Sequence, residues 1–248
     1  MTANPTYLIT GVTRGIGYGL LKSYLSRPNI TVIAGVRDPS TSAKTLKGLP
    51  TAAGTKLIIV KINSTSATDA KAAIEKLKTD NGIQKLDVVI ANAGLGHSWQ
   101  KVLNTSPESV REYTEVNTIG PLVLFQAAYP LLEAAAQPKF IVMATGVSSF
   151  GLMEHMPIPS AGYGASKAGV NYITRKIHFE HPNVTSVCLY PGWVKTELGD
   201  AIAKSIGMQE ASITTEESVK GVVTQVDAAT REGTSGKFID YEGKDVPW

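Results

Sequence analysis

The alternation of short apolar runs with longer helical patterns constrains the fold more than any other feature. The apolar runs lie at residues 7–10, 30–36, 57–63, 86–91, 139–145, 184–190 and 237–240. Runs of this length, separated by helices, are typical of βα units that build a parallel sheet. No linker, charge block or repeat divides the chain, so we expect one domain over residues 1–248 with a mostly parallel sheet of seven strands.

A glycine-rich turn joins the first predicted strand to the first helix. Its glycines, Gly11, Gly15 and Gly17, follow the pattern Gly-x-x-x-Gly-x-Gly. Glycines let the backbone approach a ligand, and a helix N-terminus favours an anion, so this turn fits a pyrophosphate. The spacing departs from the Gly-x-Gly-x-x-Gly dinucleotide pattern. A turn that only satisfies local geometry is the alternative.

Arg37 follows the second predicted strand, where the adenosine ribose lies in a dinucleotide-binding βαβ unit. A carboxylate there favours NAD, whereas Arg37 together with Arg14 can pair with the 2′-phosphate of NADP. Asp38, one position later, leaves that preference open, and so does a purely solvated Arg37. Asn63 ends the third strand and can reach an adenine edge.

Tyr163 and Lys167 are four residues apart in a predicted helix, so their side chains share one face. Beside the phenol, the Lys167 ammonium favours the phenolate, and we expect it to lower the pKa of Tyr163. Such a tyrosine can transfer a proton near neutral pH. An ordinary half-exposed helix pair is the alternative.

Further helical patterns cover residues 66–79, 107–136 and 214–230. We expect the second to break at Gly120–Pro121, residues 201–212 to be less regular, and residues 146–160 to form a loop. The third begins like a capped helix, with Thr214 before Glu216 and Glu217.

Composition excludes several classes of protein. The net charge of +3 comes from mixed charges without a long run of one sign, which argues against a nucleic-acid or membrane partner. Cys188 is the single cysteine and lies in an apolar run, so we expect a buried, reduced thiol. Residues 1–6 carry no pattern of a secretory leader, and no apolar stretch reaches membrane-spanning length. We expect a cytoplasmic protein.

These motifs, in this order, resemble the short-chain dehydrogenase/reductase family over nearly the whole chain. The resemblance implies a Rossmann-type, doubly wound α/β fold with three layers. The matching segments are Thr10 to Gly17 for the cofactor turn, Asn92-Ala93-Gly94 after strand four, Tyr163 with Lys167, and Pro191-Gly192 through Thr196. Residues 159–199 further resemble fungal ketoreductases of the norsolorinic acid ketoreductase type.

The resemblance implies a role for each matching position. Lys167 would bind the nicotinamide ribose, Tyr163 would protonate the carbonyl oxygen, and Asn117 would hold a water that links Lys167 to solvent. The Val194 backbone and the Thr196 side chain would contact the carboxamide. The remaining expected cofactor contacts are Gly11, Thr13, Arg14, Gly15, Ile16, Gly17, Arg37, Asn63, Asn92, Ala93, Gly94, Pro191 and Gly192.

One departure from the family concerns the hydroxyl that polarises the substrate carbonyl. The family ends strand five with Ser-Ser, whereas this chain has Ala144-Thr145, followed by Gly146-Val147 and the pair Ser148-Ser149. Thr145 keeps a hydroxyl and is our first choice, with Ser148 close behind. Serines that only satisfy turn backbone are the alternative for Ser148 and Ser149.

The expected activity is an NADPH-dependent carbonyl reductase, reversibly an alcohol dehydrogenase, with no metal. A non-catalytic NADP(H)-binding sensor or scaffold, and an isomerase or dehydratase on the same fold, remain open. The resemblance implies that residues 96–99, 150–156 and 201–208 with Trp193 wall a pocket for an apolar or aromatic substrate. We expect His97 and His155 to be ordinary loop residues, and a role in orienting the substrate is the alternative. The resemblance also implies a homodimer or homotetramer packed through residues 107–136 and 163–181.

Overall fold

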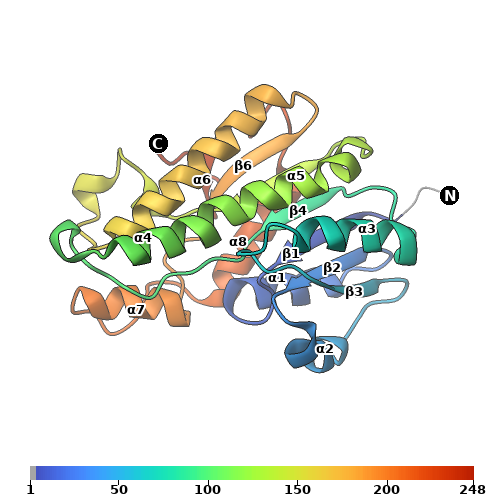
Figure 1. The fold of residues 1–248 in the computed structure, drawn as a ribbon, viewed down its shortest axis with the longest axis horizontal. Helices are drawn as coiled ribbons and strands as arrows, with labels where there is room; N and C mark the ends of the chain where they lie inside the picture. The colour runs from blue at the N-terminus through green and yellow to red at the C-terminus, as the bar shows by residue number, and fades with distance from the viewer. Residues whose placement is uncertain (1–3) are drawn as a thin grey trace.

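A computed structural model describes residues 4–248 and places a seven-stranded sheet at the centre of the molecule (Figure 1). Residues 1–3, half of the stretch where no leader was expected, lie outside the described range. The strand order is β3-β2-β1-β4-β5-β6-β7, and every neighbouring pair is parallel. The bounds are β1 Thr6–Thr10, β2 Thr31–Val36, β3 Lys56–Lys61, β4 Val88–Ala91, β5 Lys139–Met143, β6 Thr185–Tyr190 and β7 Phe238–Asp240. The predicted parallel, doubly wound sheet is confirmed.

Helices cover both faces of this sheet, because successive strand residues point to opposite sides. The helices are α1 Gly15–Leu25, α2 Pro39–Lys47, α3 Asp69–Asn81, α4 Pro107–Thr114, α5 Gly120–Glu133, α6 Ala161–Glu180, α7 Glu197–Ser205 and α8 Thr215–Ala228. Ile9, Val32 and Ile90 pack with the apolar cluster under α1 and α8, whereas Leu8, Ile33 and Val89 pack with the cluster under α3, α5 and α6. The result is the predicted three-layer α/β/α fold.

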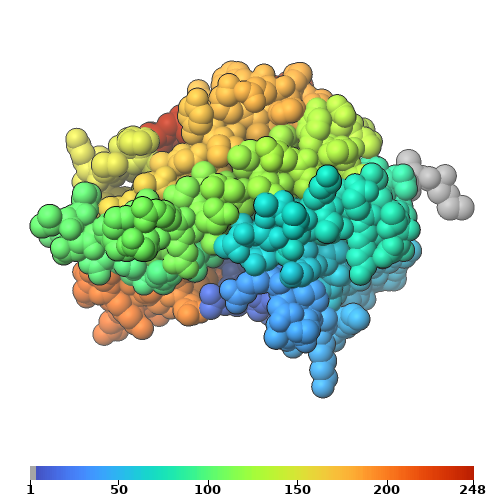
Figure 2. Space-filling view, in the orientation of Figure 1, coloured from blue at the N-terminus to red at the C-terminus, as the bar shows by residue number. Residues whose placement is uncertain are grey.

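The strand order reverses between β1 and β4, so a crevice opens at the carboxyl ends of these strands. In the space-filling view, the blue α1 and α2 region and the orange α7 region lie on either side of a recess (Figure 2). Ligands of doubly wound sheets bind at this position.

Helical bounds differ from the sequence prediction in three places. The segment 107–136 stays helical at Gly120–Pro121, where α5 begins directly after another helical turn and Pro121 lies in its first turn. The irregularity is instead a π-helical turn, Glu115–Ile119. Helix α7 covers residues 201–205 of the stretch 201–212 that was expected to be less regular. Helix α2 was not predicted because it buries only Leu46.

The loop of residues 146–160 holds two short 3₁₀ turns, Gly146–Ser148 and Met153–His155, and another lies at Val102–Asn104. Thr214 caps α8 by accepting a hydrogen bond from the Glu217 N–H at 3.1 Å, as predicted. Cys188 is fully buried and unpaired. Within residues 4–248, none of the helices has the length and apolar character needed to cross a membrane.

Candidate active site

One open cavity of about 1630 Å³ runs along the carboxyl ends of the strands. Small-molecule pockets usually measure roughly 300 to 1,000 Å³, so this cavity has room for a dinucleotide and a second ligand. Its walls include every residue expected to contact a cofactor: Gly11, Thr13, Arg14, Gly15, Ile16, Gly17, Arg37, Asn63, Asn92, Ala93, Gly94, Tyr163, Lys167, Pro191, Gly192, Val194 and Thr196. The sequence motifs therefore meet at one site.

The three glycines of the first turn have different environments. A Cβ at Gly11 would lie 2.7 Å from the Ala93 Cα, and one at Gly17 would lie 2.1 Å from the Gly11 carbonyl oxygen, so packing alone requires glycine at both positions. Gly15 has φ +55°, and a Cβ there would meet only the Thr196 side chain, at 3.4 Å. Gly15 therefore faces the cavity, which is the backbone approach that a pyrophosphate needs.

Asn92 braces this turn from the neighbouring strand. Its side-chain amide donates to the carbonyl oxygens of Thr10 at 2.9 Å and Gly11 at 3.1 Å. The Thr10 hydroxyl in turn accepts from the backbone N–H groups of Asn92 and Ala93. The Asn-Ala-Gly motif thus fixes the shape of the glycine turn.

The adenosine end of the cavity carries one solvent-exposed arginine. Arg37 directly follows β2 and lines the cavity. The Asp38 carboxylate is engaged elsewhere, because it caps α2 by accepting from the Ser40 N–H at 2.9 Å and the Ser40 hydroxyl at 2.7 Å. These hydrogen bonds lower the pKa of Asp38. Asp38 acts mainly as a helix cap.

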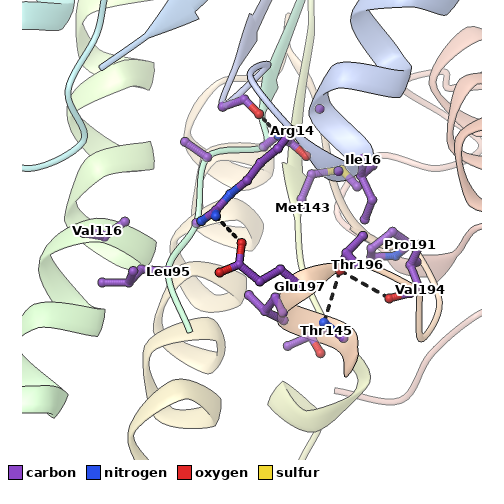
Figure 3. Close-up of a pocket in the computed structure, with 18 of the residues that line it drawn as sticks. Arg14, Ile16, Leu95, Val116, Met143, Thr145, Pro191, Val194, Thr196 and Glu197 are labelled. Atoms are coloured by element: carbon purple, nitrogen blue, oxygen red, sulfur yellow. Dashed lines mark hydrogen bonds and ion pairs between the residues drawn. The ribbon is translucent and has the colours of Figure 1, made fainter. Parts of the chain in front are cut away.

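Arg14 crosses the cavity and pairs with Glu197, the first residue of α7 (Figure 3). Both side chains are exposed, at 75% and 77%. Arg14 therefore does not join Arg37 in this structure. Glu197 was not singled out from the sequence, because the residues that make the pair are 183 apart.

Tyr163 and Lys167 lie on the buried side of α6 and both line the cavity. The Lys167 Nζ donates to the Met143 carbonyl oxygen at 2.7 Å, and burial lowers the pKa of Lys167 to about 8. Burial also raises the pKa of Tyr163, and only the Thr145 side chain opposes that rise. The expectation that Lys167 lowers the tyrosine pKa is wrong here, because burial dominates and the ammonium is bonded to the end of β5.

The two candidate hydroxyls after β5 point in different directions. Thr145 lines the cavity beside Tyr163. The Ser148 hydroxyl donates to the Thr145 carbonyl oxygen at 2.6 Å and accepts from the Asn171 side chain at 2.9 Å. Ser148 is only 4% exposed and, unlike Thr145, does not line the cavity. The geometry favours Thr145.

Asn117 lies in the π-helical turn and is fully buried. Its Oδ1 accepts from the Leu95 N–H at 2.7 Å, and its Nδ2 donates to the Leu95 carbonyl oxygen at 2.8 Å and to the Ser166 hydroxyl at 3.0 Å. A Cβ at Gly94 would lie 3.4 Å from the Asn117 Oδ1 and 3.5 Å from the Lys167 Nζ, so both groups meet beside Gly94. The Asn117 amide therefore shapes the site by holding Leu95.

The segment after β6 closes the cavity opposite the glycine turn. The Thr196 hydroxyl caps α7 by accepting from the Gly199 N–H at 3.1 Å and donates to the Val194 carbonyl oxygen at 3.3 Å (Figure 3). Gly192 adopts φ +84°, which favours glycine. Thr196 thus links α7 to the segment Pro191–Thr196, which we expected to contact the nicotinamide carboxamide.

One part of the cavity wall is mostly apolar. Its lining includes Val147, Met156, Pro157, Ile158, Trp193, Leu198, Ile202 and Ile206, with the polar side chains of Glu112, His155 and Tyr190. Trp99 packs edge-on against Tyr163, with ring centroids 5.3 Å apart.

Only some of the residues that were expected to wall the substrate pocket line the cavity. Phe150 is 72% exposed and lies outside the lining, and His97 pairs with Glu112 at 2.9 Å. Sequence reasoning missed Leu198, although its i,i+4 spacing with Ile202 after the Thr196 cap is an available signal.

Comparisons with known proteins agree with this geometry. Residues 5–207 match the short chain dehydrogenase family. A norsolorinic acid ketoreductase from Dothistroma septosporum is 40% identical over 98% of this chain and 92% of its own length. A short-chain dehydrogenase from Pyricularia oryzae is 40% identical over the full length of both chains.

Solved structures share the fold. An NADPH-bound carbonyl reductase from chicken fatty liver has a TM-score of 0.85 and 30% identity, covering 99% of each chain. The carbonyl reductase Sniffer of D. melanogaster has the same TM-score at 22% identity, covering 99% of this chain and 100% of that one. The chain therefore belongs to the short-chain dehydrogenase/reductase family of nicotinamide-dependent oxidoreductases.

Proposed function

We propose that this protein, as one NAD(P)-binding domain over residues 1–248, is an NADPH-dependent carbonyl reductase that also works in reverse as an alcohol dehydrogenase. The observation that carries the proposal is the convergence of Tyr163, Lys167 and Thr145 on one cavity whose other walls fit a dinucleotide. Gly15 leaves space for a pyrophosphate, and Thr196 stands opposite it.

Tyr163, Thr145 and Lys167 each have a chemical role in this proposal. The bound nicotinamide supplies the hydride. Tyr163 gives its proton to the carbonyl oxygen, and the raised pKa of the buried phenol keeps that proton in place at neutral pH. Thr145 donates a hydrogen bond to the same oxygen, and Lys167 holds the nicotinamide ribose. Asn117, which meets Lys167 beside Gly94, would hold a water that links Lys167 to solvent.

Cofactor preference rests on the adenosine end. Arg37 is exposed and lines the cavity, and Asp38, the carboxylate that disfavours a 2′-phosphate, is committed to capping α2. Arg14 becomes a second phosphate ligand when it leaves Glu197. These features support NADPH over NADH. Asn63, also in the lining, would contact the adenine.

The apolar walls support an aromatic or other apolar ketone as substrate. Met156, Trp193 and Leu198 offer a flexible thioether, an indole and a branched side chain beside the proposed proton donor. Relatives named norsolorinic acid ketoreductases are consistent with a bulky substrate. The reaction requires no metal in this proposal.

We also propose that two copies associate through the outer face of α6. Tyr172 and Phe179 lie seven residues apart on that helix and are 68% and 66% exposed. Such neighbouring exposed aromatics are typical of protein interfaces. The assembly would be the homodimer or homotetramer that the resemblance implies. A reducing cytoplasm suits the single free Cys188.

The proposal is tested by NADPH oxidation with a panel of aromatic ketones and quinones, comparing the wild type with Tyr163→Phe. Loss of the phenolic proton should lower kcat by about 10²- to 10⁴-fold while NADPH still binds. Tight NADPH binding without turnover would favour the sensor or scaffold alternative. Product formation without net NADPH oxidation would favour an isomerase or dehydratase.

A further inference from the structure

The two serines after Thr145 point away from the cavity into buried hydrogen-bonded positions. Ser149 is 1% exposed. Its hydroxyl donates to the Pro247 carbonyl oxygen and accepts from the Leu152 N–H at 3.0 Å. Ser149 is the first residue of the loop 149–158. Its bond to Pro247 joins this loop to a segment almost one hundred positions further along the chain.

Residues 246–248 are held firmly on their other side. The Val246 N–H donates to the Phe238 carbonyl oxygen at 2.8 Å, and Val246 is buried in a cluster with Ala144 and Cys188. The Trp248 ring lies 5.6 Å from the Phe238 ring and 4.8 Å from the Arg175 guanidinium. This segment is therefore anchored to β7 and α6 independently of the loop.

The loop of residues 149–158 depends on this anchor. The Gly151 N–H donates to the Trp248 carbonyl oxygen at 2.9 Å, and a Cβ at Gly151 would lie 2.7 Å from the Pro247 Cβ. Among the described residues, the other hydrogen bonds of residues 149–158 join positions within a few residues of one another. Pro247 and Trp248 thus provide its long-range backbone contacts.

The far end of the same loop forms part of the substrate side of the cavity. His155, Met156, Pro157 and Ile158 line the cavity, whereas Ser149 and Gly151 do not. Met156 packs against Gly146, where a Cβ would lie 2.6 Å from the Met156 Cε. A shift of the loop at Ser149 therefore changes the wall beside Thr145 without touching the cofactor end.

We propose that Ser149, Gly151 and the segment Pro247–Trp248 are positioning residues that set the substrate-side wall of the cavity and so determine which ketones fit. This inference rests on the proposed reductase activity and deepens it. These residues act through the position of Met156 and its neighbours and touch neither the reacting atoms nor the cofactor.

Two variants perturb the contact in different ways. Ser149→Ala removes the hydrogen bond to Pro247, and Gly151→Ala keeps every hydrogen-bonding group but pushes Pro247 away. The matched controls are Ser26→Ala, whose hydroxyl bonds only to Ser23, and Gly48→Ala, where a Cβ meets backbone atoms no closer than 3.5 Å. Each control makes the same chemical change as its test variant, but outside the loop of residues 149–158 and outside the Pro247–Trp248 segment.

The readouts are KM and kcat for a bulky ketone, 2-acetonaphthone, and a small one, butane-2,3-dione, with the NADPH Kd from calorimetry. We expect both variants to raise KM for 2-acetonaphthone by about three- to tenfold. For Ser149→Ala this is the effect of one lost hydrogen bond, and for Gly151→Ala it comes from the displacement of Pro247. The NADPH Kd and kcat for butane-2,3-dione should stay unchanged, and amide hydrogen exchange should accelerate in residues 150–158 but not in α6.

Unchanged exchange and KM in both variants would overturn the inference. A parallel loss of NADPH affinity, turnover of both ketones and thermal stability would also overturn it, since that pattern belongs to a general folding defect. If the wild type turns over neither ketone, the reductase proposal fails separately. Hydrogen exchange, and calorimetric binding of 2-acetonaphthone to the NADP⁺ complex, then still decide the positioning role.

Discussion

Replacing Lys167 with methionine should stabilise the folded chain while it removes activity. Lys167 is 5% exposed and has one hydrogen bond, from its Nζ to the Met143 carbonyl oxygen. Burial lowers the pKa of its ammonium from 10.5 to about 8. The folded chain therefore holds this proton less tightly than the unfolded chain does.

The size of the effect follows from that difference. At pH 7, below both pKa values, keeping the ammonium charged in the interior costs roughly 3 kcal/mol of unfolding free energy. Methionine has a similar length without the charge, and the lost hydrogen bond costs about 1 kcal/mol. The net gain of about 1 to 2 kcal/mol should raise the Tm by roughly 2 to 8 °C.

The sign of the effect should change with pH. The folded-state pKa lies below the unfolded one, so the wild type gains stability as pH rises from about 8 to 10.5 and the ammonium of the folded chain loses its proton. Lys167→Met has no such dependence. The variant should be the more stable chain at pH 7 and, lacking the hydrogen bond, the less stable one above pH 10.5.

Urea unfolding followed by circular dichroism from pH 6 to 10.5 measures this crossover. Lys101→Met, at an exposed lysine, is the matched control, and its difference from the wild type should stay constant across the range. A Lys167→Met chain that is less stable at pH 7, or a stability difference that does not vary with pH, would refute the reasoning. In either case the buried ammonium would not be a cost to folding.

Three further predictions concern the cavity. Arg37→Ala should weaken NADPH by about tenfold or more and NADH much less, because only NADPH carries the 2′-phosphate, and calorimetry that finds equal losses would remove the argument for NADPH. Glu197→Gln should tighten NADPH by about two- to fivefold by releasing Arg14 from an exposed ion pair, and the gain should vanish in an Arg14→Ala background; a gain that persists there would contradict competition for Arg14. Thr145→Ala should lower kcat by about 10²-fold, whereas Ser148→Ala should mainly lower the Tm, and the reverse result would make Ser148 the polarising hydroxyl.

The fold and the position of the cavity could be predicted from the sequence because both depend on local patterns. Seven apolar runs predict buried parallel strands. Gly15 and Thr196 each lie in a turn that follows a strand, and in a parallel sheet such turns meet at one edge. Helix α2 was not predicted because Leu46 is its single buried residue, so its sequence carries no apolar stripe at helical spacing. The π-helical turn has no sequence signal that a helical period can detect.

The directions of the side chains depend on tertiary contacts, which the spacing of residues along the chain does not predict. The four-residue interval correctly put Tyr163 and Lys167 on one face of α6, but the Lys167 ammonium goes to Met143, on a strand 24 residues away. Ser148 is turned inward by Asn171, and Arg14 is drawn to Glu197. Such partners are set by packing across the sheet, so they become visible only in three dimensions.

Isotope transfer tests the central claim most directly. Purified protein is incubated with 2-acetonaphthone and NADPH that is dideuterated at nicotinamide C4, and the alcohol is analysed by mass spectrometry. Hydride transfer at the Tyr163 end of the cavity predicts one deuterium on the carbinol carbon of the product. It also predicts about 10²- to 10⁴-fold less labelled alcohol from the Tyr163→Phe chain over the same time. An alcohol without deuterium, or equal labelling by both chains, would contradict it.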